Sequence, residues 1–310
     1  MNIVILKDHI EGNNSVDMID NLVEAQFAQR YLSVKHHVTQ IDFVPDIEKM
    51  IAELKNAAPD LVFNLVETVC NSGALSIIAV QLLEMSGIPY TGCTIYSQVV
   101  TADKSLTKKV LQTNEIPTPV DYFQPDTEYI IKAKTEHASA GLDNKSVRKF
   151  SSEEELQKAL DLKKKQTGLD HIAEQYIDGR EFSCAFLGQM MLNPVEYVFD
   201  SHFKGHKIIT YEAKWNEETE SYKHHQRTFA MEENIRTSII ALTSKCRSIL
   251  NIKGYARVDY RMDSDGRLFA IDINTNPCIS PDSTFIAMIE QKGISIEEMF
   301  DKIIENAFIS

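Results

Sequence analysis

The sequence predicts an α/β unit that is followed by an α+β body. The first ninety residues alternate between short apolar runs, typical of strands, and longer mixed runs, typical of helices. After the helix that is expected to begin at Ser152, the chain is strand-rich up to Phe199. Two further strand-type segments, 254–263 and 267–274, flank an Asp-Gly pair near the C-terminus. Alternating elements indicate a parallel sheet with helices on both faces, whereas segregated strands and helices indicate an α+β arrangement.

The N-terminal unit is expected to provide three strands and three helices. The strands are predicted at 3–6, 38–43 and 61–65, and the helices at 15–32, 46–56 and 75–85. Ligands of parallel sheets gather at the carboxyl ends of the strands. Asn64 and Glu67, at the end of the third strand and just past it, are therefore candidates for lining a site.

The rest of the chain supplies the second part of the fold. A helix at 103–113 should end before Pro117 and Pro119, because proline disfavours a continuing helix. Ser152, with Glu155 three residues later, forms a capping box that begins another helix. We also expect a strand at 129–132, a loop of small residues at 137–141, and helices at 232–250 and 295–306.

Composition and charge argue against several function classes. The 310 residues carry a formal net charge of −13, so an extended basic surface for nucleic acid or anionic membrane is not expected. The start of the chain has no signal-peptide pattern, and no apolar run reaches the roughly 20 residues that span a bilayer. Five scattered cysteines without a Cys-x-x-Cys motif argue against a disulfide framework or a zinc site. We therefore expect a cytoplasmic protein.

The Asp-Gly pair at 265–266 predicts a hairpin with a two-residue turn, in which both central residues have positive φ. Counting outward from this turn places Asp259 opposite Asp272 and Arg257 opposite Asn274. Strand side chains repeat with period two, so all four should project from one face. Directly opposed Cβ atoms lie about 4.5–5.5 Å apart, at which distance two carboxylates repel unless a cation lies between them.

Asp259, Asp272 and Asn274 are therefore predicted metal ligands. Two carboxylates and an amide offer only oxygen atoms, which suits an Mg²⁺ ion that also holds phosphate. The alternative is a surface hairpin with its polar residues in water. Against that alternative, four apolar residues are expected to pack on the other face: Val258, Tyr260, Ile271 and Ile273.

A series of short motifs runs in order from about residue 60 to residue 290. They are Phe63-Asn-Leu-Val-Glu67, Leu82-Leu-Glu-Met-Ser-Gly-Ile-Pro-Tyr-Thr-Gly92, Asp103-Lys104 with Lys108-Lys109, Ile116-Pro-Thr-Pro119, Ile130-Ile-Lys132, Glu174-Gln-Tyr-Ile-Asp-Gly-Arg-Glu-Phe182, Tyr211-Glu-Ala-Lys214, Arg257-Val-Asp259 and Asp272-Ile-Asn-Thr-Asn-Pro277. Each alone is weak, but the ordered set is specific. With it, the chain resembles the ATP-grasp superfamily and, within it, the D-alanine–D-alanine ligase-like enzymes.

The resemblance implies an ATP-grasp fold in three domains. These would be an N-terminal parallel-sheet domain on the substrate side at 1–94, a central lobe at 95–177 and a C-terminal lobe with the metal site at 178–310. ATP phosphates would be held by three lysines and a small-residue loop, the adenine by a linker between the lobes, and the ribose hydroxyls by a carboxylate. The lysines are Lys104, Lys132 and Lys214, and the loop residues are His137, Ser139 and Gly141. The linker residues are Glu174, Gln175, Tyr176 and Ile177, and the carboxylate is that of Glu181.

The resemblance also implies catalytic and substrate roles. Arg257 matches the arginine that stabilises the tetrahedral intermediate, and Lys214 is assigned to catalysis beside it. The three predicted metal ligands match magnesium ligands, with Mn²⁺ as the alternative ion. Glu67, Cys278 and Ser283 would lie on the substrate side. Plainer explanations exist for some of these residues: a lone lysine is usually a solvated charge, Glu181 could face solvent on an edge strand, and Ser283 could cap a helix.

The departures from the family pattern cluster on the amino-acid side of the site. They are the segment 7–15 in place of a glycine-rich signature, Ala138 in place of the first of two loop serines, Trp215 in place of a tyrosine, Glu67 in place of a histidine and Cys278 in place of a glycine. The ATP side is spared, apart from Asp272 where glutamate is commoner. This asymmetry predicts that the chemistry is kept while the substrate differs from D-alanine.

The functional hypothesis is an ATP-dependent carboxylate–amine ligase that forms an amide or peptide bond through an acylphosphate and releases ADP and phosphate. Its partners would be a small amino acid or carboxylate and an amine, and a homodimer is expected by family analogy. Two alternatives stay open. One is a true D-alanine–D-alanine ligase of peptidoglycan synthesis. The other is a non-catalytic ATP-binding regulatory protein, for which Arg257 has no obvious use.

Overall fold

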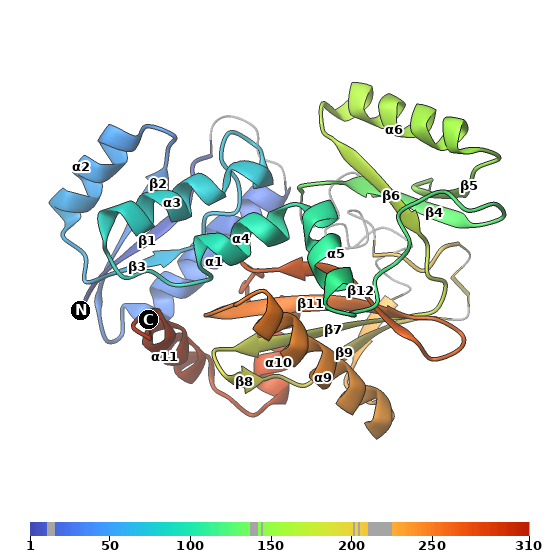
Figure 1. Cartoon of the computed structure of the whole chain (residues 1–310). Helices are drawn as coiled ribbons and strands as arrows, with labels where there is room; N and C mark the ends of the chain where they lie inside the picture. Colours follow the sequence, from blue (N-terminus) through green and yellow to red (C-terminus); the bar gives the residue numbers. More distant parts are fainter. Residues whose placement is uncertain are drawn as a thin grey trace.

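The computed structural model describes residues 1–10, 16–136, 142–143, 145–200, 202–203, 205–209 and 225–309, with the side chains of 16–18 set aside. Three sheets carry the fold of these residues, and Figure 1 shows them following one another along the chain. None of the helices described is long and apolar enough to cross a membrane. The mixed architecture, with one parallel and two antiparallel sheets, agrees with the predicted fold class.

The first sheet is parallel, as predicted. Its strands β1 (Asn2–Asp8), β2 (His37–Phe43) and β3 (Leu61–Asn64) lie in the order β2-β1-β3. Side chains alternate along β1: Ile3 and Ile5 join one core cluster, and Val4 and Leu6 join another. The first cluster contains residues of α1 (Val16–Leu32) and α11 (Ile296–Ala307), and the second contains residues of α2 (Ile47–Ala57) and α3 (Ile77–Ser86). Both faces are therefore covered by helices.

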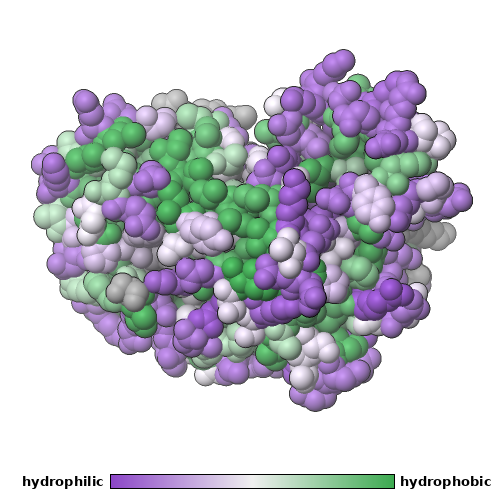
Figure 2. Space-filling model, in the orientation of Figure 1, coloured by the Kyte–Doolittle hydropathy of each residue, from purple (hydrophilic) through white to green (hydrophobic). Residues whose placement is uncertain are grey.

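Two helices lead from the first sheet to the second. These are α4 (Ile95–Ala102) and α5 (Lys104–Thr113), which begins at Asp103, whose carboxylate accepts from the N–H groups of Ser105 and Leu106. Apolar side chains gather over α3 and α4 on the face shown in Figure 2. Met85 of α3 and Val99 of α4 are exposed.

The second sheet is antiparallel, in the order β5-β4-β6. Its strands are β4 (Glu128–Ala133), β5 (Val147–Lys149) and β6 (His171–Gln175), and α6 (Glu153–Thr167) covers one face, as Figure 1 shows. Ser152 caps α6 as predicted, because its hydroxyl accepts from Glu155 N–H. Glu155 does not return the bond to Ser152, however, but accepts from Ser151.

The third sheet is the largest, in the order β10-β9-β7-β11-β12. Its bounds are β7 (Arg180–Leu187), β9 (Val195–Phe199), β10 (His225–Thr228), β11 (Tyr255–Met262) and β12 (Leu268–Asn274), with β8 (Met190–Met191) beside β7. Helix α9 (Glu233–Ile249) packs on one face, and α10 (Thr284–Gln291) joins the cluster shared with the first sheet.

The hairpin of β11 and β12 pairs as predicted, but its turn is different. Asp259 faces Asp272 and Arg257 faces Asn274. The predicted two-residue turn is wrong: Gly266 N–H donates to Asp263 O, Asp263 N–H donates to Arg267 O, and three residues lie between. Of the two residues expected at positive φ, only Gly266 has it, at 79°.

A β-bulge restores the predicted register. Tyr260 pairs with Ala270 whereas Asp259 pairs with Asp272, so Ile271 is the extra residue. The bulge also shifts which side chains face the core: Ala270 and Ile273 are buried there, but Ile271 lines a cavity on the opposite side. The prediction that Ile271 packs in the core is therefore wrong.

Candidate functional site

A cavity of about 490 Å³ lies where the second sheet, the third sheet and the loop after β12 meet. The polar face of β11 and β12 forms its floor, and β4 with the linker after β6 forms the facing wall. Most predicted site residues with described positions line it: Lys104, Lys132, Glu174, Gln175, Tyr176, Ile177, Glu181, Arg257, Asp259, Asp272, Cys278 and Ser283. His137, Ser139, Gly141 and Lys214, together with Ala138 and Trp215, lie outside the described residues.

The two predicted metal carboxylates are each paired with a cation. Arg257 binds Asp259 with both edges of its fork, with Nε to Oδ1 at 2.9 Å and Nη2 to Oδ2 at 3.0 Å. Lys104 Nζ lies 3.5 Å from Asp272 Oδ1. The Ser183 hydroxyl, on the neighbouring strand β7, also donates to Asp259. The negative charges of Asp259 and Asp272, on adjacent strands, are therefore compensated within the protein by Arg257 and Lys104.

The third predicted metal ligand, Asn274, faces Arg257 on the neighbouring strand and is not among the residues that line the cavity. In the described part of the chain no three His, Cys, Asp or Glu side chains form a metal cluster. The predicted donor set consists of two carboxylates and the amide of Asn274. Asn274 Oδ1 accepts from Asn276 N–H at 2.9 Å, which fixes its orientation. A hard oxygen set of this size leaves room for phosphate and water, as Mg²⁺ prefers.

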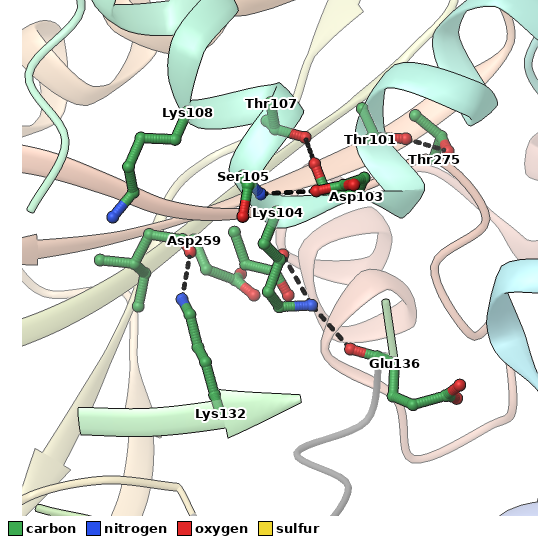
Figure 3. A network of polar contacts seen from close by, with 12 residues as sticks. Thr101, Asp103, Lys104, Ser105, Thr107, Lys108, Lys132, Glu136, Asp259 and Thr275 are labelled. Carbon is green, nitrogen blue, oxygen red and sulfur yellow. Dashed lines mark hydrogen bonds and ion pairs between the residues drawn. The ribbon is translucent and has the colours of Figure 1, made fainter. Parts of the chain in front are cut away.

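Lys132 and Glu174 form a buried charge network with Lys108. Lys132 Nζ lies 2.5 Å from Glu174 Oε1, and Lys108 Nζ lies 2.6 Å from Glu174 Oε2. Lys132 also donates to the carbonyl of Ile271 at 2.9 Å, so the bulge residue ties β4 to β12 (Figure 3). Lys108 was present in the motif series without a role, and its partnership with Glu174 could not be inferred from spacing.

The charge state of Glu174 follows from these partners. Burial raises its pKa, but the ammonium groups of Lys132 and Lys108 outweigh burial and hold the pKa below the ordinary value of 4.5. Glu174 is thus an ionised carboxylate with 3% of its side chain exposed. It orients Lys132, whose ammonium faces the cavity beside Lys104 (Figure 3).

The linker after β6 contributes, with several other segments, to an apolar part of the cavity lining. The aliphatic side chains that line the cavity include Ile130, Leu142, Ile177, Ile208, Ile209 and Ile271. The N–H groups of Gln175 and Tyr176 donate to Val120 O and Glu128 O, so they are engaged with neighbouring protein segments. The predicted adenine contacts of this linker would therefore have to come from backbone groups other than these two N–H groups.

The cavity is acidic around Cys278. Cys278 donates its thiol hydrogen to Asp20 at 3.0 Å and lies 2.9 Å from the hydroxyl of Ser280. Burial, with Glu24 and Asp20 nearby, raises the pKa of Cys278 well above its ordinary value, so the group is a neutral thiol. Glu67 does not line the cavity, but its charge also raises the pKa of Cys278 and of the buried Glu24.

Ser283 has a structural role in addition to its position at the cavity. Its hydroxyl accepts from Ile286 N–H at 3.2 Å and caps α10, the plainer explanation considered from sequence. Ser183, Tyr197 and Arg261 are among the cavity residues that sequence reasoning missed. Their only signal is alternation along β7, β9 and β11, which becomes informative once the strands are paired.

Comparison with known proteins identifies the family. The family described as the D-ala D-ala ligase C-terminus matches residues 96–305. The chain belongs to this family. The prediction of an ATP-grasp, D-alanine–D-alanine ligase-like protein is therefore confirmed, and with it the class of enzyme, an ATP-dependent ligase that forms a C–N bond.

Individual relatives extend the match over the N-terminal unit. A D-alanine–D-alanine ligase of Aquifex aeolicus is 27% identical over 98% of this chain and 100% of its own length. The D-alanine–D-alanine ligase of Bacillus anthracis has a similar fold, with a TM-score of 0.75 at 18% identity over 100% of this chain and 98% of that one. VanG D-Ala:D-Ser ligase of Enterococcus faecalis has a TM-score of 0.71 at 19% identity over 98% of both chains.

Proposed function

We propose that this ligase uses ATP and Mg²⁺ to activate a small carboxylate as an acylphosphate and joins it to an amine, with a substrate other than D-alanine. The observation that carries the proposal is the convergence of opposite charges in one cavity. Asp259 and Asp272 lie on its floor, and Lys104, Lys132 and Arg257 surround them. Acylphosphate chemistry needs this combination, because it transfers a highly charged group between two oxygens.

Each described residue has a role in this mechanism. Asp259, Asp272 and Asn274 would hold Mg²⁺, which supplies charge neutralisation at the phosphates. Lys132, oriented by Glu174 and by the carbonyl of Ile271, would contact a phosphate of ATP. Lys104 is anchored by the carbonyl of Glu136 at 2.6 Å, which places its ammonium at the same end. The proposed phosphate contacts of His137, Ser139, Gly141 and Lys214 complete the set.

Arg257 would act in the second half of the reaction. The substrate carboxylate attacks the γ-phosphorus, ADP departs, and the amine then attacks the acyl carbon to give a tetrahedral intermediate. Arg257 lies partly buried at the floor of the cavity, and it would stabilise the oxyanion that forms. Phosphate leaves as the amide forms, and the nitrogen gives up one proton to solvent.

The acidic substrate end supports an amine-bearing substrate. Asp20 lines the cavity beside Cys278, and Glu24 and Glu67 lie close enough to raise the pKa of that thiol. A substrate ammonium would be attracted by this concentration of carboxylates. Cys278 stands where the family pattern has glycine, so its side chain reduces the space for a substrate. Both features support a specificity that differs from the D-alanine pair.

An ADP-release screen tests the proposal. Purified protein with ATP and Mg²⁺ would be offered pairs of amino acids, small carboxylates and amines, and any product would be identified by its mass. We expect one carboxylate–amine pair to release ADP and phosphate in equal amounts with an amide product. Arg257→Ala should lower the rate of both by about 10²–10³-fold. Release of ADP without an amide would contradict the ligase assignment.

The names of the relatives favour a second candidate, the D-alanine–D-alanine ligase itself. In that case D-alanine alone would suffice for ADP release and would yield its dipeptide. Failure of every pair, with ATP still bound, would instead support the regulatory alternative.

The expected homodimer, for which the apolar surface over α3 and α4 is a candidate interface, is tested by sedimentation of the same preparation.

A further inference from the structure

Arg261 holds together three segments that surround the nucleotide end of the cavity. Its Nη1 donates to Glu181 Oε2 at 2.8 Å and to the carbonyl of Lys207 at 2.6 Å. Its Nη2 donates to the carbonyl of Gly179 at 3.1 Å and to the hydroxyl of Tyr176 at 3.3 Å. The guanidinium carbon also lies 4.9 Å from the centre of the Tyr176 ring. One side chain therefore joins β7, the linker after β6 and the segment that contains Lys207.

Its position makes this arrangement specific to the site. Arg261 is the cross-strand neighbour of Glu181, and both side chains line the cavity. Only 5% of the Arg261 side chain and 13% of the Glu181 side chain are exposed, so water does little to screen the pair. In the described part of the chain, Arg261 Nε is buried without a hydrogen-bond partner, so the protein satisfies this guanidinium only in part.

Glu181 depends on Arg261 to act as an acceptor. Burial raises its pKa above the ordinary value, and Arg261 is the strongest influence in the opposite direction. Without the guanidinium, a buried carboxyl beside Asp259 would favour its protonated form, which is a weaker acceptor. Arg261 thus opposes the effect of burial on Glu181 and fixes the orientation of its carboxylate through Oε2.

The approach of the linker to β11 requires a glycine. Gly179 has φ of +154°, and a Cβ at this position would lie 2.0 Å from the carbonyl oxygen of Met262. The chain can therefore pass close enough for Arg261 to bind the Gly179 carbonyl and Glu181 together. A lysine could not reproduce this, because an ammonium is a point charge without the planar fork.

We propose that Arg261 is the positioning residue that fixes the Glu181 carboxylate for the ribose hydroxyls of the nucleotide, and that it thereby sets the preference of this site for ribonucleotides over deoxyribonucleotides. The inference rests on the proposed function, since it takes ATP as the ligand and Glu181 as its ribose contact. Arg261 acts through Glu181 and has no part in the transfer of the phosphoryl group.

Direct binding of ATP and 2′-deoxy- and 3′-deoxy-ATP, measured by calorimetry, tests this. A hydrogen bond to a charged acceptor is worth roughly tenfold in affinity, so the wild type should prefer ATP over at least one deoxy analogue by about that factor. Arg261→Met should bind all three nucleotides alike, and Arg261→Lys should recover little of the preference. Arg267→Met removes an exposed arginine of the same hairpin and should behave as the wild type.

A double variant separates positioning from direct contact. If Arg261 acts through Glu181, Arg261→Met added to Glu181→Gln should change the nucleotide preference no further. A thermal melt identifies any variant that has lost its fold, and Arg261→Lys then provides the comparison. The inference is overturned if a folded Arg261 variant keeps the wild-type preference, or if the wild type binds ATP without any preference. If the wild type binds no ATP, the proposed function fails together with the inference.

Discussion

Arg257 and Asp259, two positions apart on β11, bind each other through both atoms of a fork, at 2.9 and 3.0 Å. The residue proposed to stabilise the oxyanion is thus paired with a proposed metal ligand. A cation bound to Asp259 would neutralise the carboxylate in its place, and Arg257 would then be available to the substrate. Metal binding and the readiness of Arg257 are therefore expected to be coupled.

Replacing Arg257 should affect the chemistry more than nucleotide binding. We expect Arg257→Ala to lower kcat by about 10²–10³-fold, the usual effect of removing one oxyanion donor, with little change in the KM for ATP. Arg257→Lys keeps the charge without the fork and should recover only part of kcat. Initial rates of ADP release at saturating substrates measure this, with Arg267→Ala as the control. An unchanged kcat would remove Arg257 from the mechanism.

The metal ligands should be identified by the magnesium dependence of the rate. Chelation should abolish ADP release, and added Mg²⁺ should restore it. Asp259→Asn and Asp272→Asn should raise the Mg²⁺ concentration for half-maximal rate by at least about tenfold, since even outer partners of a metal site have effects of that size. Asp265→Asn, in the exposed turn of the same hairpin, is the matched control. Equal magnesium dependence in all variants would exclude this ligand set.

The alternation of side chains along β11 and β12 made it possible to predict from sequence which residues form the floor of the site. Asp259 was placed opposite Asp272 correctly, although the turn was wrong by one residue. The turn differs because Asp263 Oδ1 accepts from the N–H groups of Asp265 and Arg267 and holds a three-residue loop. The bulge at Ile271 then compensates, and an apolar residue in an apolar strand gives no sign of it.

Long-range partners explain what sequence could not supply. Arg261 continues the alternation of Arg257 and Asp259, but its role depends on Glu181, which is 80 positions earlier. Lys108 likewise gains meaning only from Glu174, which is 66 positions later in the chain. Helix limits, by contrast, came from local signals such as Ser152, which caps α6 as expected.

The buried Lys108–Glu174 contact should contribute more to the free energy of unfolding than an exposed lysine of the same helix does. Lys108→Met leaves the Glu174 carboxylate buried with one cation fewer, and breaking a buried pair from one side costs about 3–5 kcal/mol. Lys109→Met, an exposed lysine at the next position, should change the free energy of unfolding by less than about 0.5 kcal/mol. Urea unfolding measures both values. A small effect of Lys108→Met would mean that Lys132 alone compensates Glu174.

Glu174 and Glu24 should respond to pH in opposite directions. The folded-state pKa of Glu174 lies below 4.5 because its two lysines outweigh burial, so its contribution is present above pH 4.5 and is lost as pH falls through the folded-state pKa. The pKa of Glu24 shifts in the opposite direction, because burial, with Glu67 nearby, raises it well above 4.5. The contribution of Glu24 to stability is therefore lost as pH rises above 4.5.

Two isosteric variants check this sign. Relative to the wild type, Glu174→Gln should be destabilised at pH 7, and the difference should shrink as pH falls below 4.5. Glu24→Gln still accepts from Ile279 N–H and should be more stable than the wild type at pH 7, with the advantage shrinking toward pH 4.5. Unfolding free energies of both variants and the wild type should be measured from about pH 3 to about pH 8, which includes the ordinary carboxyl pKa range. If both variants differed from the wild type with the same sign at pH 7, the assignment would be refuted.

Cys278 should shape the substrate end without acting as a nucleophile. Its raised pKa and its donation to Asp20 keep it a neutral thiol, which reacts slowly with alkylating reagents. Iodoacetamide at neutral pH should therefore label the exposed Cys70 first, as judged by peptide mass, without loss of ADP release. Cys278→Ser should keep the rate within a few-fold, whereas Cys278→Gly, the residue of the family pattern, should admit larger substrates and shift the preference among amines. Inactivation that follows the labelling of Cys278, together with an inactive Cys278→Ser, would instead establish a thiol role.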